Sequence, residues 1–162
     1  MPEFVMEGRD HAARTESDFV LGFIEAMFLI ETSPAFDSSD WFTDERRAAS
    51  ENGQADGELP GDVGYTDLHP DALEAIRRDC NTFWILNRDA LESACESGGY
   101  DMAQAGVDYW FTRTGHGVGY WDRDLGDVGG VLSDAARDAE AAHAWFGDHV
   151  VHGDAPFVHV SL

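Results

Sequence analysis

The sequence predicts an α+β fold in which three main helices pack on a small antiparallel sheet made of two β-hairpins. Two observations predict it. Apolar residues recur every three to four positions in three segments, which is the helical period, and every second position in two others, which is the strand period. The 162 residues are 43% hydrophobic and 12% aromatic, which is enough for one core, so a single domain over 1–162 is expected.

Three segments with the helical period are expected to form the main helices: 16–31, 70–96 and 132–146. In the first, Phe19, Phe23 and Met27 fall on one face, as in a helix that packs on a core. Pro70 stands at a first-turn position, where its missing N–H breaks no helical hydrogen bond. Gly98 follows the second segment and is typical of a helix C-terminus.

Two segments with the strand period are expected to form the β-hairpins: 107–121 and 149–160. Val107, Tyr109 and Phe111 alternate with their neighbours at a two-residue period, and the glycine-rich residues 114–117 follow as a turn. The second hairpin is expected to turn at residues 153–154. Strands that arrive as hairpins predict an antiparallel sheet.

Periodicity fades between residues 36 and 67, where nine acidic residues stand against Arg46 and Arg47. We expect a short helical turn over 44–50 and otherwise a partly mobile acidic loop. A loop of this length is uncommon in a compact domain and is either functional or a tolerated insertion.

The two cysteines are expected to be free thiols. Cys80 and Cys95 fall in one predicted helix, which places them about 22 Å apart at 1.5 Å per residue. A disulfide requires Cα atoms within about 7 Å of each other. The two residues are therefore not expected to pair with each other.

The charge is strongly acidic, with 20 Asp, 12 Glu, ten Arg and no Lys, for a net charge of -22. Such a surface disfavours direct binding to nucleic acid or to an anionic membrane. No stretch approaches the roughly 18 apolar residues that span a bilayer. Glu3 and Glu7 stand where a signal peptide has basic residues. A cytoplasmic location is therefore expected, and the oligomeric state is left open.

A small enzyme at the first predicted hairpin is one alternative. His116 lies in the glycine-rich turn, and Asp122 follows on the returning strand. A histidine beside a carboxylate can act as a general base, and Arg113 could clamp an anion. The same residues can instead shape a turn and pair across strands. No catalytic residue is therefore favoured.

A metal protein belongs to the same alternative. Four histidines lie in the last twenty residues, close to Asp148 and Asp154: His143, His149, His152 and His159. Zinc requires three or four converging ligands, and neither an HExxH motif nor paired CxxC motifs occur. The sequence therefore predicts no metal and no cofactor.

One segment carries a family resemblance. Residues 100–123 read YDMAQAGVDYWFTRTGHGVGYWDR. This segment resembles a family of small tailed-phage proteins in which an aromatic strand, T-R, a G-H-G turn and an aromatic-W-D-R strand recur. Cys80 and the predicted closing hairpin match the same pattern, so the resemblance spans about 73–160. It implies a phage origin and assigns no activity. The long acidic loop and the absence of lysine depart from the pattern.

Two accounts of the acidity compete. In the first, the carboxylates imitate DNA phosphates, of which duplex DNA carries one per about 1.7 Å of axis. The protein would then bind and inhibit a host nucleic-acid-binding or defence protein, as the phage resemblance favours. In the second, the protein is a soluble accessory protein whose acidity reflects adaptation to high salt or a high-GC genome.

The first account predicts that carboxylates of the acidic loop and of the segment after the first hairpin contact Arg and Lys of the partner. The predicted partner-binding residues are Asp37, Asp40, Asp44, Glu45, Asp56, Glu58, Asp62, Asp122, Asp124 and Asp127.

Overall fold

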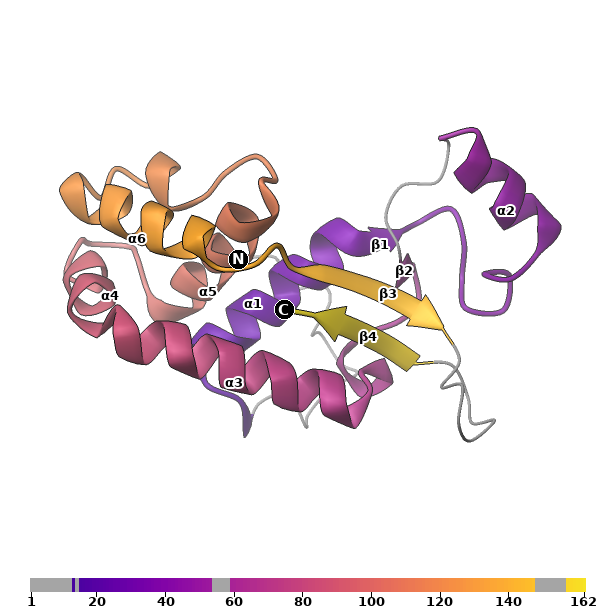
Figure 1. The fold of residues 1–162 in the computed structure, drawn as a ribbon, viewed down its shortest axis with the longest axis horizontal. Coiled ribbons are helices and arrows are strands. Elements are labelled where there is room, and N and C mark those ends of the chain that lie inside the picture. Colours follow the sequence, from indigo (N-terminus) through magenta and orange to yellow (C-terminus); the bar gives the residue numbers. More distant parts are fainter. Residues whose placement is uncertain (1–12, 14, 54–58, 148–156) are drawn as a thin grey trace.

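The computed structural model describes residues 13, 15–53, 59–147 and 157–162. Within them, six α-helices account for most of the secondary structure. The helices are α1 (Asp18–Glu31), α2 (Asp44–Glu51), α3 (Pro70–Leu86), α4 (Arg88–Cys95), α5 (Met102–Thr114) and α6 (Asp127–Asp138). Figure 1 shows α1 passing through the middle of the molecule, α4 and α6 at one end, and α2 projecting at the other.

The described strands form two separate two-stranded sheets. Strands β1 (Thr32–Ser33) and β2 (Leu59–Pro60) are parallel. Strands β3 (His143–Gly147) and β4 (Phe157–Ser161) are antiparallel, and Trp145 is directly opposite His159. The β3–β4 sheet lies beside α3 in Figure 1.

The predicted architecture of three helices on an antiparallel sheet of two hairpins is therefore wrong. The segment predicted as the first hairpin is mostly helix α5, in which every residue from Ala105 to Arg113 is buried. A helix that is buried on all sides has no polar face, so its sequence lacks the helical period. Asp101 caps its start by accepting a hydrogen bond from the Gln104 N–H (2.8 Å). Gly115, at φ 71°, ends it in the left-handed conformation that glycine favours.

The other boundaries also differ from the prediction. The helix expected over 70–96 is divided into α3 and α4 at Asn87, whose side chain donates to the Phe83 carbonyl (3.0 Å) in competition with the helical backbone. The alanine-rich segment 132–146 is helical only to Asp138. Its last residues belong to β3, because pairing with β4 buries Ala144 and Phe146. The first half of the predicted closing hairpin lies outside the described residues.

The predicted first helix and the short helical turn are confirmed as α1 and α2. Ser17 caps α1 by accepting from the Val20 N–H (3.4 Å). Helix α2 lies in the segment between β1 and β2. The two ends of this segment are joined by the Asp62 carboxylate, which accepts hydrogen bonds from the Ser38 N–H and the Ser38 hydroxyl at 2.7 Å each. The acidic segment is therefore not a loop throughout.

The centre of the fold is a close crossing of α1 and α5. At Gly106 an added Cβ would lie 1.9 Å from the Phe19 carbonyl oxygen, and at Gly22 it would lie 1.9 Å from the Ala103 carbonyl oxygen. Glycine at both positions lets the two backbones touch. Aromatic rings surround the crossing, including Phe83 and Tyr109, which stack at 4.0 Å between centroids.

Three carboxylate–arginine pairs tie this core together. Asp108 is fully buried and binds Arg123. Asp79 accepts from the buried Arg113 (2.6 Å) and from the Tyr109 hydroxyl (3.0 Å). The third pair joins Glu16, before α1, to Arg77 of α3, and the Tyr65 hydroxyl also donates to Glu16 (2.6 Å).

The Glu16 site predicts a pH-dependent stability. The Arg77 hydrogen bond lowers the pKa of Glu16 below its ordinary value of 4.5, and burial, with the Glu16 hydrogen bond, raises the pKa of Tyr65 to about 12. A carboxyl pKa that is lower in the folded state stabilises the fold above pH 4.5 and loses this effect as the pH falls through the folded-state value. Glu16→Gln should therefore cost about 2 kcal/mol of unfolding free energy at pH 7, and progressively less below pH 4.5.

Urea unfolding of both proteins between pH 7 and pH 3 measures this difference. Glu74→Gln is the matched control, because its pair with Arg78 is 72% exposed on both sides, and its cost should be below about 0.5 kcal/mol. A gap for Glu16→Gln that stays constant over this pH range would contradict the assignment.

Candidate protein-binding surface

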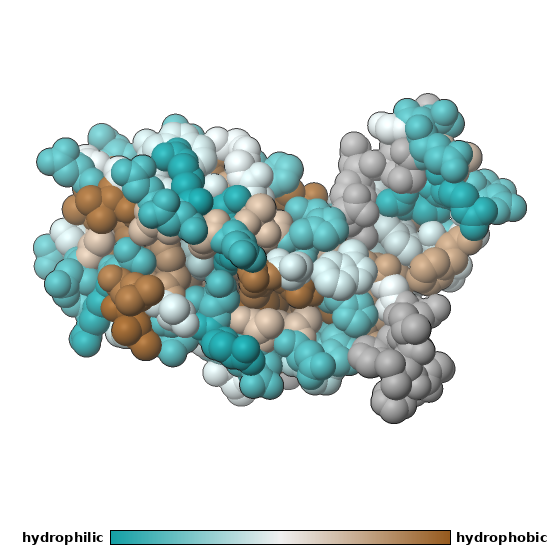
Figure 2. All heavy atoms as spheres, in the orientation of Figure 1, coloured by the Kyte–Doolittle hydropathy of each residue, from teal (hydrophilic) through white to brown (hydrophobic). Residues whose placement is uncertain are grey.

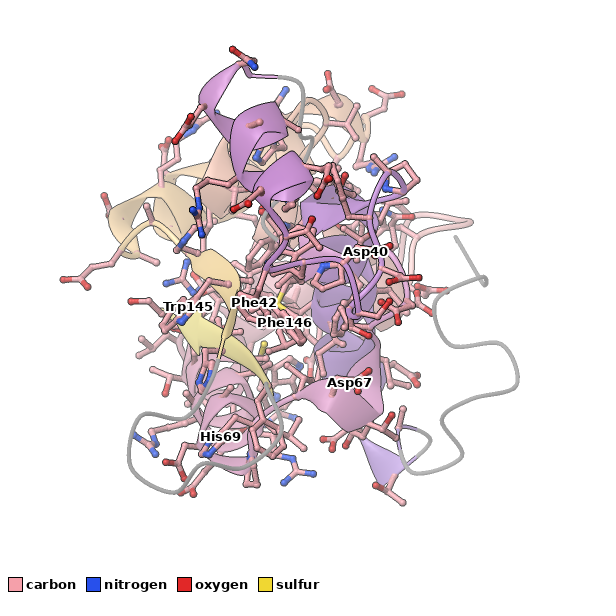
Figure 3. All side chains as sticks on the ribbon, turned by 90° about the vertical axis from the view of Figure 1, so that its right-hand side faces the viewer. Asp40, Phe42, Asp67, His69, Trp145 and Phe146 are labelled. Atoms are coloured by element: carbon pink, nitrogen blue, oxygen red, sulfur yellow. The ribbon has the colours of Figure 1, made fainter. Side chains whose placement is uncertain are left out.

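Two large aromatic side chains are exposed where the residues just before α2 contact the β3–β4 sheet. Phe42 is 57% exposed and Trp145 is 40% exposed. They border a shallow pocket of about 320 Å³ lined by Trp41, Phe42, Thr43, Arg46, Arg47, Trp145 and Phe146. Figure 3 shows Phe42 and Phe146 side by side, with Trp145 next to them on β3.

The floor of this pocket is fixed by buried rings. Phe42 stacks on Phe146 with centroids 6.0 Å apart. Trp41 meets Phe146 edge-on at 6.4 Å. The buried Arg46 guanidinium lies 4.0 Å from the Trp41 ring centroid, a cation–π contact that holds α2 against the residues before it. The Phe42 side chain is therefore exposed but held in place by its contact with Phe146 and by the contact of Arg46 with the neighbouring Trp41.

Trp145 belongs to a ladder of stacked rings on the outer face of β3 and β4. Neighbouring side chains on a strand alternate between faces, so His143 and Trp145 share the outer face while Ala144 is buried beneath. Trp145 stacks with His143 at 5.9 Å and with His159 of β4 at 5.5 Å. His159 in turn stacks with His69 at 5.3 Å.

His69 joins the ladder to α3. Its Nδ1 accepts from the Asp71 N–H (3.2 Å) and so caps the helix N-terminus. Figure 3 shows His69 below Trp145 in this view. The ladder therefore occupies a fixed position at this end of the fold.

The predicted partner-binding carboxylates fall into two separate groups. Asp37, Asp40, Asp44, Glu45 and Asp62 lie around α2 and β2, and all are exposed. The second group is also exposed but lies between α5 and α6, toward the opposite end of the molecule in Figure 1: Asp122, Asp124 and Asp127. Asp56 and Glu58 lie outside the described residues. The structure thus does not join the two groups into one surface.

Some of these carboxylates also organise the chain. Asp62 holds Ser38, and the Asp37 carboxylate accepts from the Ser39 N–H (3.0 Å) and the Asp40 N–H (3.2 Å). The Ser39 hydroxyl also donates to Asp37 (2.5 Å), and this hydrogen bond is the main cause of the lowered pKa of Asp37, with the two backbone N–H donors adding to it. Asp40 and Glu45 are better placed to meet a partner, because both are exposed and neither is needed for these turns.

The described arginines are largely neutralised within the protein. Seven of the eight form ion pairs with carboxylates of this chain: Arg47, Arg77, Arg78, Arg88, Arg113, Arg123 and Arg137. Arg46 is engaged as well, because its buried guanidinium lies over the Trp41 ring. The view in Figure 2 is mostly hydrophilic and is especially so over α2. Exposed carboxylates therefore outnumber available cations on this surface.

The structure gives no support to the enzyme alternative at His116. His116 is exposed just after α5, and its N–H donates to the Phe111 carbonyl (3.2 Å) as part of the helix end. The Arg113 side chain is only 1% exposed and points to Asp79 and to the Glu140 carbonyl (2.9 Å). Arg113 is thus not free to clamp an anion beside His116 and Asp122.

The described residues also contain no group of three or more His, Cys, Asp or Glu side chains placed to hold a metal ion. His149 and His152 lie outside the described residues. Cys80 and Cys95 are free thiols, as predicted. Burial raises the pKa of both thiols, which disfavours the reactive thiolate.

Sequence reasoning missed the aromatic pocket and the ladder. The signal for the ladder was the alternation of His143 and Trp145 with Ala144 and Phe146, which has the strand period but lay in a segment predicted as helix. The sequence predicts that the dense aromatic residues of 109–121 belong to the core. This prediction is confirmed for Tyr109, Trp110, Phe111 and Tyr120, which are buried, and is wrong for Trp121, which is 41% exposed.

Comparison of the chain with protein-family models, curated proteins and solved structures finds no match. Among the residues that the structure describes, no helix has both the length and the apolar character needed to cross a bilayer.

Proposed function

We propose that the protein binds the basic surface of a nucleic-acid-binding or defence protein and inhibits it, with exposed carboxylates in place of DNA phosphates. The observation that carries this proposal is the internal pairing of the arginines. Because seven of the eight described arginines already have carboxylate partners, the exposed acids around α2 meet few cations of their own chain. In this proposal the chain is phage-encoded and acts in the host cytoplasm.

Inhibition would follow from occupancy. A net charge of -22 attracts a basic cleft at long range and speeds association. Once bound, the carboxylates would contact the Arg and Lys side chains that otherwise hold phosphates. Such binding weakens steeply with salt, since the Debye length falls from about 10 Å at 0.1 M to about 3 Å at 1 M.

Charge reversal tests which acidic group is used. Asp40→Lys with Glu45→Lys removes carboxylates beside α2, and Asp122→Lys with Asp127→Lys removes them between α5 and α6. Because the α2 group lies beside the aromatic pocket, we expect the first variant to lose at least about tenfold in affinity at 0.1 M salt. The measurement is capture by the tagged protein from a bacterial lysate, with mass spectrometry of the retained proteins.

The matched control is Glu96→Lys with Asp138→Lys, which makes the same change in net charge. Both residues are exposed near helix C-termini, where a cation is favoured. Equal losses in all three variants would mean that only net charge matters. If the wild-type protein retains no nucleic-acid-binding protein at 0.1 M salt, the proposal is wrong. The acidity then reflects adaptation to high salt or a high-GC genome, as the accessory-protein account states.

A further inference from the structure

The aromatic pocket at the α2 end adds a feature that phosphate imitation alone does not need. A purely electrostatic surface does not require exposed aromatic rings, yet Phe42 is 57% exposed, Trp145 is 40% exposed, and both border the same pocket. Large exposed aromatic residues around a pocket are typical of protein interfaces, where a few such side chains provide most of the binding energy.

The pocket is held in shape before any partner arrives. Phe42 rests on Phe146, and Trp145 stacks between His143 and His159. Little side-chain freedom is therefore left to lose on binding, which favours affinity. Its volume of about 320 Å³ is sufficient for one large apolar side chain.

The charges around the pocket indicate the chemistry of its occupant. The arginines that line the pocket are already engaged, since Arg46 lies over the Trp41 ring and Arg47 pairs with Asp44, and the rest of the lining is mostly aromatic, so the pocket suits an apolar side chain. The exposed Asp40 lies on one side of Phe42 in Figure 3, with Trp145 on the other side. Glu45 is exposed three residues beyond Phe42, on α2. A complementary partner therefore has an apolar residue for the pocket and basic residues beside it.

We infer that this surface binds a basic segment of a partner protein by taking one of its aromatic or large aliphatic side chains between Phe42 and Trp145. Neighbouring Lys or Arg residues of that segment contact Asp40 and Glu45. The inference rests on the proposed function. It assigns the selectivity for one partner to the apolar contact between Phe42 and Trp145. The apolar contact persists at salt concentrations that screen the carboxylates, because hydrophobic burial is not weakened by salt.

Two capped peptides test the inference: Arg-Arg-Arg-Phe-Arg-Arg-Arg and Arg-Arg-Arg-Gly-Arg-Arg-Arg. Isothermal titration calorimetry at 0.1 M and 0.5 M salt gives the affinity of each. We expect the phenylalanine peptide to bind the wild-type protein about tenfold more tightly than the glycine peptide at 0.5 M salt. Phe42→Ala and Trp145→Thr should each remove most of this preference.

Leu86→Ala is the matched control, since Leu86 is 76% exposed at the junction of α3 and α4, away from the pocket. It should keep the full preference. Equal binding of the two peptides by the wild-type protein would overturn the inference and leave the charge-reversal result of the proposed function intact. Binding of neither peptide at 0.1 M salt would overturn both.

A single-stranded dT oligonucleotide tests the alternative ligand, because nucleic-acid bases also commonly stack on exposed aromatic side chains. With so acidic a chain we expect no binding at 0.1 M salt. Binding that is lost in Trp145→Thr and kept in Leu86→Ala would overturn the inference in favour of a nucleic-acid site.

Discussion

Asp108→Asn should lower the free energy of unfolding by about 3–5 kcal/mol, the range for breaking a buried ion pair from one side. Asp108 is fully buried on α5 and accepts from Arg123 (Nε at 3.0 Å, Nη2 at 2.7 Å), from the Tyr100 hydroxyl (3.0 Å) and from Gln104 (3.0 Å). An asparagine side chain has one acceptor oxygen and would turn an NH₂ group toward these donors. The loss leaves the Arg123 guanidinium, whose side chain is only 28% exposed, without its carboxylate.

Urea unfolding followed by circular dichroism measures this cost. Asp134→Asn is the control, because its 3.6 Å pair with Arg137 is largely exposed; it should change stability by less than about 0.5 kcal/mol. The ion pair between Asp108 and Arg123 also raises the pKa of Arg123, chiefly through the hydrogen bond to Asp108. Similar small costs for the two variants would contradict the buried network.

Gly106→Ala should be destabilising by about 3 kcal/mol, at the upper end of the usual cost of overpacking. The new methyl group would lie 1.9 Å from the Phe19 carbonyl oxygen and 3.0 Å from the Phe23 backbone nitrogen, so α1 and α5 would have to separate. Both obstacles are backbone atoms of a helix and cannot move aside as a side chain would. The higher helix propensity of alanine, about 1 kcal/mol, offsets only part of this cost.

Gly130→Ala provides the matched control on α6. It lies in an exposed helix interior, and an added Cβ would meet nothing within 4 Å. The same substitution should therefore stabilise the protein by about 0.5–1 kcal/mol. Thermal unfolding of the two variants should shift the midpoint in opposite directions. A stabilising Gly106→Ala would show that α1 and α5 do not meet as closely as described.

Local signals predicted the elements whose determinants are local. The stripe of Phe19, Phe23 and Met27 lies on α1, and Pro70 begins α3 as expected. The errors arose where tertiary contacts decide. Helix α5 lacks a polar face because α1, α4, α6 and residues 120–122 pack around it. Its start could still have been predicted, because Asp101 is a typical N-cap residue and Gln104 follows three residues later.

The candidate site could be predicted only in part for the same reason. Exposure of the carboxylates followed from their number, but their division between two ends of the molecule depends on how α2 and α6 are placed. The neighbourhood of Phe42 and Trp145 depends on contacts between residues about one hundred positions apart. Contacts between such distant residues cannot be predicted from the local periodicity of apolar residues.

The central claim is that the acidic surface occupies the nucleic-acid site of a basic protein. The most direct measurement is a competition titration, in which duplex DNA is added at about 0.1 M salt to the complex of the tagged protein with the protein it retains. The account predicts that DNA releases the retained protein completely, and that Asp40→Lys with Glu45→Lys lowers the DNA concentration required. A complex that persists at saturating DNA, with both ligands bound at once, would contradict it.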